Sequence, residues 1–592
     1  MEPIPQHTVF LFDSIEISSD FDSGNIESVK ELEKNWFGLW TGPDASLSTR
    51  PSNCKSWFYF KVSSKTEKPL KFTIKNLNLQ NKLFSEGMKP VYKTSSSDWK
   101  RVESKVEFQI LNDNFETTFT HTCNSKPTYF AFTYPWSLSE NETFMNELQK
   151  NCKDSKIYYS KENLINTLQR RPCYIITITS QLYLREKREK NFVGLFPEAG
   201  LRCNKFYNKQ IVFISSRVHP GEVQSSHVLN GFLKFICGND KRAETLRDLF
   251  IFKIVPILNP DGVFCGYYRT DTRGANLNRF YRNPLITEHP TIFAVKELMK
   301  YYKSTYNIAF YLDLHGHASK KGCFVYGNYM DFTEQIETCL FAKYMQLNCV
   351  NFDFEACNFT EVNMRSPDKR DGLSKEGSGR VAFFKELGIL RSYTLECNYN
   401  TGRIINKLLN PEDDLSDINS PVYSQGPPKF DIKVFEDVGK AVGVSLIDLE
   451  QTNPLTRVKN YNEVKLEVAG YVGNMVPFRY DPIIRKVVKG IVELENYLEE
   501  VLKEKLEKRG FKSERFKARQ RSDACKSKCR LATVQKEEIK KNLMGGNLGS
   551  NSNLHQVKDS NLAIKRNSFL PQIKPVSTYR GKSLNRKQVK LL

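Results

Sequence analysis

Residues 211–222 read Ile211-Val-Phe-Ile-Ser-Ser-Arg-Val-His219-Pro-Gly-Glu222, and an apolar segment with helical spacing follows at 223–237. The β-branched residues before His219 predict a buried strand, and Pro220-Gly221 ends it. Glu222 then opens a helix. An imidazole and a carboxylate three positions apart are both good Zn²⁺ ligands, and a catalytic zinc needs a third ligand and an open position. The sequence therefore predicts a third ligand elsewhere in the chain.

Two further predicted strands end in residues that suit such a site. Residues 308–314 form an apolar run interrupted by Asp313, and they lead into His315-Gly316-His317. Residues 389–397 include Ser392-Tyr-Thr-Leu-Glu396, which places a carboxylate where a general base is needed. Open α/β sheets carry their chemistry at the carboxyl ends of the strands. We therefore expect one site at the ends of three neighbouring strands.

Strands alternate with helices from Cys173 onward, which predicts a mainly parallel or mixed sheet covered on both faces. The predicted strands are residues 174–179, 211–216, 251–258, 308–314, 323–327 and 389–397. The predicted helices are residues 223–237, 289–303, 333–348 and 431–450. The polar segment 351–380 is too long for a simple connection, and such segments are usually functional or disordered.

The rest of the chain divides by composition. Residues 57–62, 70–74, 102–111 and 128–134 alternate or run apolar between turn-forming residues, which predicts a small antiparallel sandwich. We predict a β-rich domain at 1–150, an α/β catalytic domain at 151–455, a helical extension at 456–510 and a disordered basic tail at 511–592. Residues 138–170 are predicted to form a junction with short helices, and 487–508 a further helix.

The net charge of +21 is concentrated at the C-terminal end. Residues 501–592 contain 24 Lys and Arg against 7 Asp and Glu, whereas the other 500 residues contain 64 against 60. A nucleic-acid-binding body is therefore not expected, although a basic tail suits an acidic polymer as well as simple solubilisation. No apolar run has the ~20 residues of a membrane span, and no signal-peptide pattern opens the chain. The 14 scattered cysteines favour reduced thiols in the cytosol.

Five motifs in order carry a family resemblance: His219-Pro-Gly-Glu222, Asn259-Pro-Asp-Gly-Val263, Asn276-Leu-Asn-Arg279, Asp313-Leu-His-Gly-His-Ala318 and Tyr393-Thr-Leu-Glu396. Together they resemble the cytosolic carboxypeptidases, a branch of the zinc metallocarboxypeptidases, over roughly residues 5–455. The resemblance implies a zinc-carboxypeptidase-type mixed sheet flanked by helices and preceded by a β-rich domain. It also implies one Zn²⁺ per chain.

The resemblance assigns roles to particular residues. His219, Glu222 and His315 are the expected zinc ligands, and Glu396 is the expected general base and acid. Asp313 and His317 are each either a partner of a ligand or a structural residue. The expected substrate-binding pair, Asn278 and Arg279, matches the family position for the terminal carboxylate, and Arg269 matches the arginine that stabilises the oxyanion. Arg273 and Arg282 lie in the same segment and compete for these assignments.

The resemblance also implies that the substrate ends in glutamate, and specificity for that side chain requires a cation in its pocket. Arg380 lies about where relatives line that pocket, although a solvated basic loop is the alternative. The digestive carboxypeptidases carry a substrate-capping tyrosine in the corresponding stretch, and residues 351–384 contain none. That role is therefore unassigned.

The sequence thus predicts a cytoplasmic zinc metallocarboxypeptidase that removes glutamates from polyglutamylated proteins. By resemblance, tubulin or microtubules are the expected partner, the γ-linked branch-point glutamate is included, and other glutamate-rich tails are further substrates. The cytoskeleton, the cilium and a nuclear fraction are the expected locations. A zinc amidohydrolase acting on small acylated amino acids and a non-catalytic microtubule-binding protein are the alternatives. The sequence does not separate branch-point from linear glutamates.

Overall fold

The structure is a computed structural model, and it describes residues 8–153, 156–198, 200, 202–368, 370–408, 427–475, 485, 489 and 490. The predicted helix at 487–508 lies outside the described residues except for Lys489 and Gly490, and the predicted tail at 511–592 lies wholly outside them. The division into four domains stays a prediction. Within the described part of the chain, no helix is long and apolar enough to cross a membrane.

The N-terminal residues form a β-sandwich, as predicted. Its six-stranded sheet has the order β1-β2-β5-β11-β7-β8, and its five-stranded sheet has the order β3-β4-β6-β10-β9. Aromatic rings from the two sheets meet inside it: Phe72 lies 5.7 Å from Phe60 and 5.3 Å from Phe130. The elements are β1 Val9–Phe12, β2 Ile15–Ser18, β3 Ser28–Glu33, β4 Trp36–Trp40, β5 Tyr59–Ser64, β6 Lys68–Leu77, α1 Asn81–Ser85, β7 Val91–Thr94, β8 Lys100–Arg101, β9 Glu107–Leu111, β10 Asn114–Cys123 and β11 Thr128–Ala131.

A seven-stranded mixed sheet follows, with the order β12-β13-β17-β16-β18-β20-β19. The central strands β17, β16, β18 and β20 pair in parallel, whereas β12, β13 and β19 are antiparallel to their neighbours. All six predicted strands are present. The strands are β12 Ile157–Asn166, β13 Pro172–Ser180, β16 Gln210–Ser216, β17 Phe250–Val255, β18 Ile308–His317, β19 Cys323–Tyr326 and β20 Ser392–Asn398, and β14 Leu184–Arg188 pairs with β15 Asn204–Phe206 in a separate hairpin.

Helices cover both faces of this sheet, which explains why its strands are almost continuously apolar. On one face, α6 Pro290–Thr305 and α9 Gly379–Leu387 pack on a core that includes Phe213 and Tyr311. On the other face, α3 Gln224–Ile236 places Phe232 against Phe252, and α7 Phe332–Asn348 places Phe341 against Phe310. The remaining helices are α2 Leu138–Cys152, α4 Lys241–Leu249, α5 Pro260–Phe264, α8 Glu361–Arg365, α10 Ile432–Leu449 and α11 Tyr461–Gly473, with 3-10 turns η1 Leu277–Arg279, η2 Phe354–Ala356 and η3 Lys375–Gly377.

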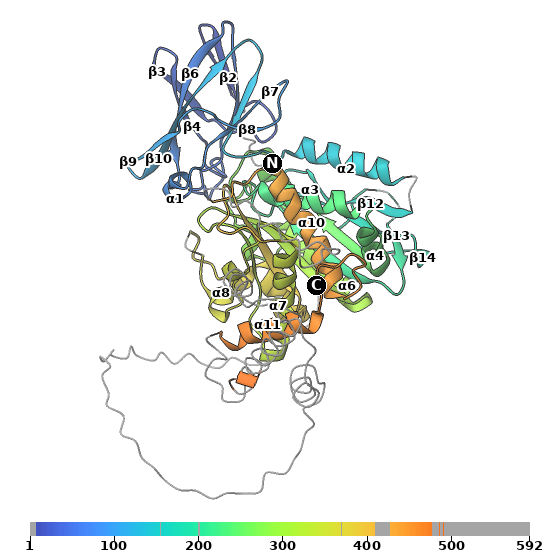
Figure 1. The fold of residues 1–592 in the computed structure, drawn as a ribbon. Helices are drawn as coiled ribbons and strands as arrows, with labels where there is room; N and C mark the ends of the chain where they lie inside the picture. The colour runs from blue at the N-terminus through green and yellow to red at the C-terminus, as the bar shows by residue number, and fades with distance from the viewer. Residues whose placement is uncertain are drawn as a thin grey trace, which may run out of the picture. The chain divides into compact units, whose positions relative to one another are not determined.

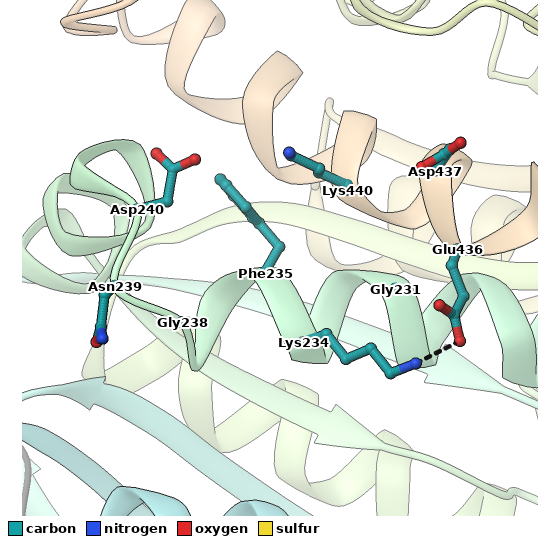
Figure 2. A pocket seen from close by; sticks show the side chains of 9 residues that line it. All are labelled: Gly231, Lys234, Phe235, Gly238, Asn239, Asp240, Glu436, Asp437 and Lys440. Atoms are coloured by element: carbon teal, nitrogen blue, oxygen red, sulfur yellow. Dashed lines mark hydrogen bonds and ion pairs between the residues drawn. The ribbon is translucent and has the colours of Figure 1, made fainter. Parts of the chain in front are cut away.

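Helix α10 runs alongside α3 at very short range (Figure 1). A Cβ added to Gly231 would lie 2.0 Å from the carbonyl oxygen of Glu436, and one added to Gly439 would lie 1.9 Å from that of Val228. Beside this crossing, both helices and residues 238–240 line a surface hollow of about 300 Å³, where Lys234 pairs with Glu436 (Figure 2). None of the predicted site residues lines it.

The prediction of short helices at 138–170 is confirmed for α2, Leu138–Cys152, and wrong for the second half of that range. Residues 157–166 form the edge strand β12, not a short helix, because pairing with β13 outweighs the helix-like spacing of Leu164 and Leu168. As predicted, the polar segment 351–380 is more than a simple connection, since it contains η2, α8 and η3. The sequence also gave no indication of α4, α9 or the β14–β15 hairpin.

Candidate active site

The turn after β16 is held by an arginine with an unusual backbone. Arg217 has φ 56° and is buried. Its guanidinium donates to the carbonyl oxygens of Pro220 and Trp136, each at 2.9 Å. Gly221 packs so closely on Tyr268 that an added Cβ would lie 2.5 Å from that ring. These hydrogen bonds and this close packing hold the turn in one conformation, which fixes the backbone on either side of His219 and Glu222.

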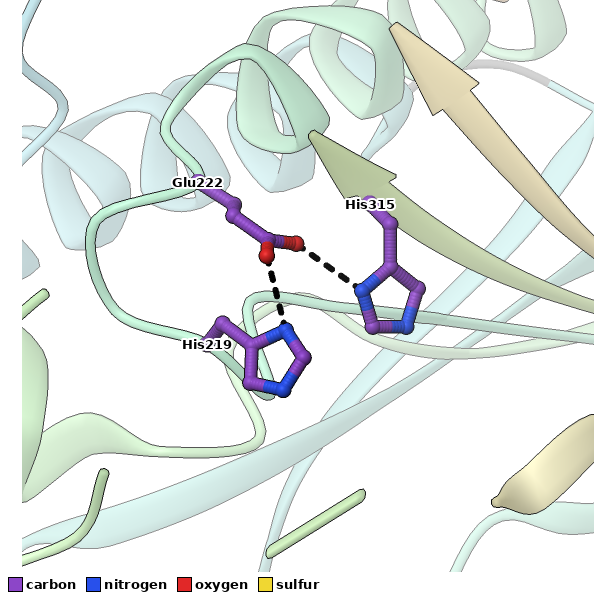
Figure 3. A group of neighbouring side chains, drawn as sticks. All are labelled: His219, Glu222 and His315. Atoms are coloured by element: carbon purple, nitrogen blue, oxygen red, sulfur yellow. Dashed lines mark hydrogen bonds and ion pairs between the residues drawn. The ribbon is translucent and has the colours of Figure 1, made fainter. Parts of the chain in front are cut away.

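Three ligand-type side chains converge at the ends of β16 and β18. One donor atom from each of His219, Glu222 and His315 lies within 4.8 Å of the others. Each carboxylate oxygen of Glu222 faces one imidazole, at 2.8 Å from Nδ1 of His219 and 2.9 Å from Nδ1 of His315 (Figure 3). The contact with His219 lacks hydrogen-bond alignment, so this buried Nδ1 has no hydrogen-bond partner among the described residues.

The other nitrogen of each imidazole has an acceptor. Nε2 of His219 lies 3.0 Å from Oδ1 of Asn276, and Nε2 of His315 lies 2.8 Å from Oδ2 of Asp313. These acceptors favour the tautomer with the proton on Nε2, which leaves both Nδ1 lone pairs directed at the carboxylate of Glu222. Metal-ligating histidines are oriented in this way by their outer partners. The residues therefore fit a Zn²⁺ ion held by two imidazoles and one carboxylate with a fourth position open.

The protonation states follow from burial and charge. Burial lowers the pKa of His219 to about 4, so this imidazole is neutral at neutral pH, as a ligand must be. Burial opposes ionisation of Glu222, but the two imidazoles hold its pKa well below the usual value. Burial also opposes protonation of His315, yet Asp313 and Glu222 raise its pKa. Glu222 and Asp313 thus place two carboxylates against the imidazole of His315, an arrangement that suits a metal cation.

Glu396 lies beside this group because β20 pairs in parallel with β18, which places it opposite His315. Its Oε2 is buried without a partner among the described residues. Burial, together with the charge of Glu222, raises the pKa of Glu396 to about 8. A carboxyl group with a pKa near neutrality is suited to both accepting and donating a proton.

The structure brings Arg269 and Arg279 together beside the His-Glu-His group. Nη1 of Arg269 lies 3.8 Å from Oε1 of Glu222. Asn278 is less open than predicted: its Oδ1 accepts from the backbone of Gly379, and its Nδ2 lies 3.3 Å from Nε2 of His315. Asn278 thus lies against His315 as well as beside Arg279.

Both arginines already hold a carboxylate from the chain itself. Oδ2 of Asp368 accepts from Nη2 of Arg269 at 2.7 Å and from Nη2 of Arg279 at 2.5 Å. Burial opposes ionisation of Asp368, but the two guanidinium groups hold its pKa well below the usual range. An ionised carboxylate therefore lies where two cationic groups converge beside the metal ligands.

Arg380 is buried at the start of α9. Its guanidinium donates to the carbonyl oxygen of Gly327, to Asn328 at 3.0 Å and to Asn363 at 3.0 Å. Its Nε has no partner among the described residues. Burial lowers its pKa to about 10, which leaves it cationic at neutral pH, and Glu396 is among the charges that act on it. Most of its hydrogen bonds are thus used within the protein, while its charge faces the site.

The competing candidates lie elsewhere. Arg273 approaches the carbonyl oxygen of Thr287, and Arg282 pairs with Glu376 and Glu386 at the surface. Nδ1 of His317 accepts from the backbone amides of residues 319 and 320, so this histidine organises a turn.

Three residues at or behind the site were not predicted from the sequence: Asn276, Asp368 and Asp44, a buried carboxylate that accepts from the backbone amide of Arg269 at 2.7 Å. Asn276 stands within a quoted motif, so its proximity to a ligand could be suspected. Asp368 lies in a segment notable for its basic residues, and nothing local marks Asp44.

Comparisons with known proteins agree with this geometry. Residues 17–133 match the cytosolic carboxypeptidase N-terminal domain, and residues 142–335 match the zinc carboxypeptidase domain. The chain is 35% identical to cytosolic carboxypeptidase-like protein 5 of Rattus norvegicus, Mus musculus and Homo sapiens, over 74% of its own length. It spans 68% of the rat protein and 64% of the mouse and human proteins.

Solved structures show the same fold. A metallo-carboxypeptidase from Burkholderia cenocepacia aligns with 74% of this chain and 100% of its own, with 21% identity and a TM-score of 0.55. A metallo-carboxypeptidase from Pseudomonas aeruginosa aligns with 74% of this chain and 99% of its own, with 19% identity and a TM-score of 0.51. On the sequence matches and the fold together, the chain belongs to the cytosolic carboxypeptidase family of zinc carboxypeptidases.

Proposed function

We propose that this protein is a zinc-dependent carboxypeptidase that removes C-terminal glutamate from glutamate-rich proteins. One observation carries the proposal: the buried, unpartnered carboxylate of Glu396 stands beside the His-Glu-His group, opposite His315 on the next strand. If Glu396 had only a structural role, its buried carboxylate would be expected to have a hydrogen-bond or ion-pair partner for each oxygen. The arginine pair at the same place supports an anionic substrate terminus.

The chain's own residues have distinct roles in this reaction. Bound at His219, Glu222 and His315, Zn²⁺ would supply Lewis-acid polarisation of the scissile carbonyl and lower the pKa of water. Glu396 accepts a proton from the attacking water and returns it to the leaving amine. Arg269 stabilises the negative charge that develops on the carbonyl oxygen.

The terminal carboxylate of the substrate is the proposed ligand of Arg279, with Arg269 beside it. A guanidinium binds a carboxylate through two parallel hydrogen bonds, which fixes the orientation of the chain end. In the structure, Asp368 holds Nη2 of both arginines. Substrate binding therefore has to displace or share this internal carboxylate.

This competition makes a directional prediction for Asp368→Asn. Removing the charge frees both guanidinium groups, and one charge-assisted hydrogen bond is worth about 1.5–3 kcal/mol, so KM for a glutamate-terminated peptide should fall about tenfold or more. Steady-state kinetics would measure it, with Glu361→Gln as a control in the same segment, because this exposed carboxylate pairs with Arg365. A rise in KM for Asp368→Asn would mean that Asp368 remains as a support of the arginines in the complex.

Selectivity for glutamate is proposed to come from positive charge around Arg380. Arg279 and Arg380 contribute to lowering the pKa of Lys375, whose burial is the main cause, so the three cations lie close together. A cluster of cations in a partly buried place favours an anionic side chain. Since the donors of Arg380 are largely occupied, its charge rather than a new hydrogen bond is the proposed source of selectivity.

The test compares peptides that end in glutamate or glutamine. Arg380→Met keeps volume but removes charge, and it should lower the kcat/KM ratio of the two peptides by about 10- to 100-fold, the worth of one charged contact. Arg380→Lys keeps the charge and should retain most of the preference. An unchanged ratio in Arg380→Met, with zinc still bound, would remove Arg380 from the specificity pocket.

The proposed protein substrate is polyglutamylated tubulin or microtubules, including the γ-linked branch-point glutamate, with other glutamate-rich tails as further substrates. The names of these relatives describe a cytosolic carboxypeptidase-like protein and specify no substrate. The proposal rests on the cationic site and on the resemblance of the motifs. The proposed location is the cytoplasm, at the cytoskeleton or cilium.

A further inference from the structure

Residues 265–276 carry Arg269 from α5 to η1 without a helix or strand of their own. Such a segment has no ladder of its own to fix the position of a side chain. Three consecutive backbone amides in it share one acceptor, the carboxylate of Asp44 in the sandwich. The amide of Tyr268 donates to Oδ1 at 2.7 Å, and those of Arg269 and Thr270 donate to Oδ2 at 2.7 and 2.9 Å.

Asp44 is itself held rigidly. Its amide donates to the carbonyl oxygen of Cys54 at 2.8 Å, and its own carbonyl oxygen accepts from Ser52 at 3.0 Å. It is 1% exposed, and burial raises its pKa to about 6 against the opposing effect of the three amides. Burying a carboxylate costs free energy, so an apolar side chain would stabilise the fold at least as well if the position only had to be filled. What it supplies is a fixed set of three hydrogen bonds to adjacent amides.

Other sandwich residues hold the same segment on both sides of Asp44. Nδ2 of Asn25 donates to the carbonyl oxygen of Gly266 at 2.8 Å. At the far end, an added Cβ on Gly274 would lie 2.1 Å from the carbonyl oxygen of Arg50. Residues of the N-terminal domain therefore contact the segment along most of its length, and the hydrogen bonds are most numerous around Arg269.

We propose that Asp44 is a positioning residue for the reaction: it fixes the backbone of residues 268–270 so that the guanidinium of Arg269 stands beside Glu222 and the substrate carbonyl. This inference rests on the proposed function. It makes the sandwich part of the active site, because one of its side chains sets the place of a catalytic group without touching the substrate. Misplacement of a catalytic group by about 1 Å costs up to about 10²-fold in rate.

The first readout is independent of turnover. In zinc-loaded protein, Asp44→Asn should speed hydrogen exchange at the amides of residues 268–270, because it replaces an acceptor oxygen with a donor. Asp22→Asn is the matched control, since Asp22 joins the sandwich to Ser139 of α2 instead. Unchanged exchange at 268–270 in Asp44→Asn would overturn the assignment.

The second readout is a double-mutant cycle with Arg269→Gln on a short glutamate-terminated peptide. Asp44→Asn should lower kcat about 10- to 100-fold with little change in KM or zinc content. In the Arg269→Gln background it should cost no more than about threefold further, because Asp44 acts through Arg269. Equal losses in both backgrounds would show a structural role only.

A second variant, Asp44→Ser, keeps one acceptor and guards against misfolding of Asp44→Asn. If neither variant folds and binds zinc, Asp44 is a folding residue and the inference is wrong. If wild-type protein with zinc bound releases no glutamate, the proposed function fails instead, and the exchange readout still decides the role of Asp44.

Discussion

Glu396→Gln is expected to lower kcat by at least about 10²- to 10⁴-fold, the usual contribution of one positioned acid–base group. The amide keeps the shape of the side chain but neither takes up nor returns a proton at physiological pH. Glu396 is not one of the three expected zinc ligands, so the zinc content should remain at one ion per chain. Peptide turnover and metal analysis of the same preparation measure both quantities.

The control for this variant is Glu361→Gln, which changes an exposed carboxylate that forms an ion pair with Arg365. Its activity should equal that of the wild type. Loss of zinc in Glu396→Gln would show that Glu396 is a ligand, and full activity with zinc bound would show that another group moves the proton.

His315→Asn is expected to remove zinc binding and activity together. It deletes one of three protein ligands, so its effect should exceed the about 10- to 100-fold loss in metal affinity that follows from removing an outer partner. Asp313→Asn, which weakens the acceptor of Nε2 and leaves all three ligands in place, should fall within that 10- to 100-fold range. Competition with a chelator measures the zinc affinity of each variant.

His317→Asn is the matched control because it lies two residues away on the same strand and holds turn amides instead of the metal group. Its zinc affinity should be unchanged. A similar loss of zinc in His317→Asn and His315→Asn would contradict the ligand assignment and indicate a general effect of altering this strand.

Local patterns were enough to predict the central sheet. Strands β16, β18 and β20 are buried on both faces for most of their length, so each apolar run is recognisable as a strand on its own, and His219, His315 and Glu396 lie near their ends. Edge strand β12 was misread because one side of it is partly exposed and polar, and only its partner β13 makes it a strand.

Contacts between residues far apart in the sequence could not be predicted from local patterns. Asp44 meets the Arg269 segment across 224 to 226 positions, and no spacing rule connects them. Asp368 was hidden for a different reason: the charge pattern of its segment suggested a basic loop, whereas the structure turns its carboxylate onto two arginines. Arg380 was predicted to lie at the site. Its hydrogen bonds to other residues of the protein could not be predicted, because they depend on tertiary packing.

The most direct test of the proposed deglutamylation uses two tubulin-tail peptides, one with a linear polyglutamate end and one with a single γ-linked branch glutamate. Each is incubated with zinc-loaded wild type and with Glu396→Gln, and the product masses are measured by mass spectrometry. Loss of whole glutamate units is expected with wild type alone, and the peptide that is shortened faster identifies the preferred linkage. If neither peptide is shortened while zinc is bound to the wild type, the proposed deglutamylation is contradicted.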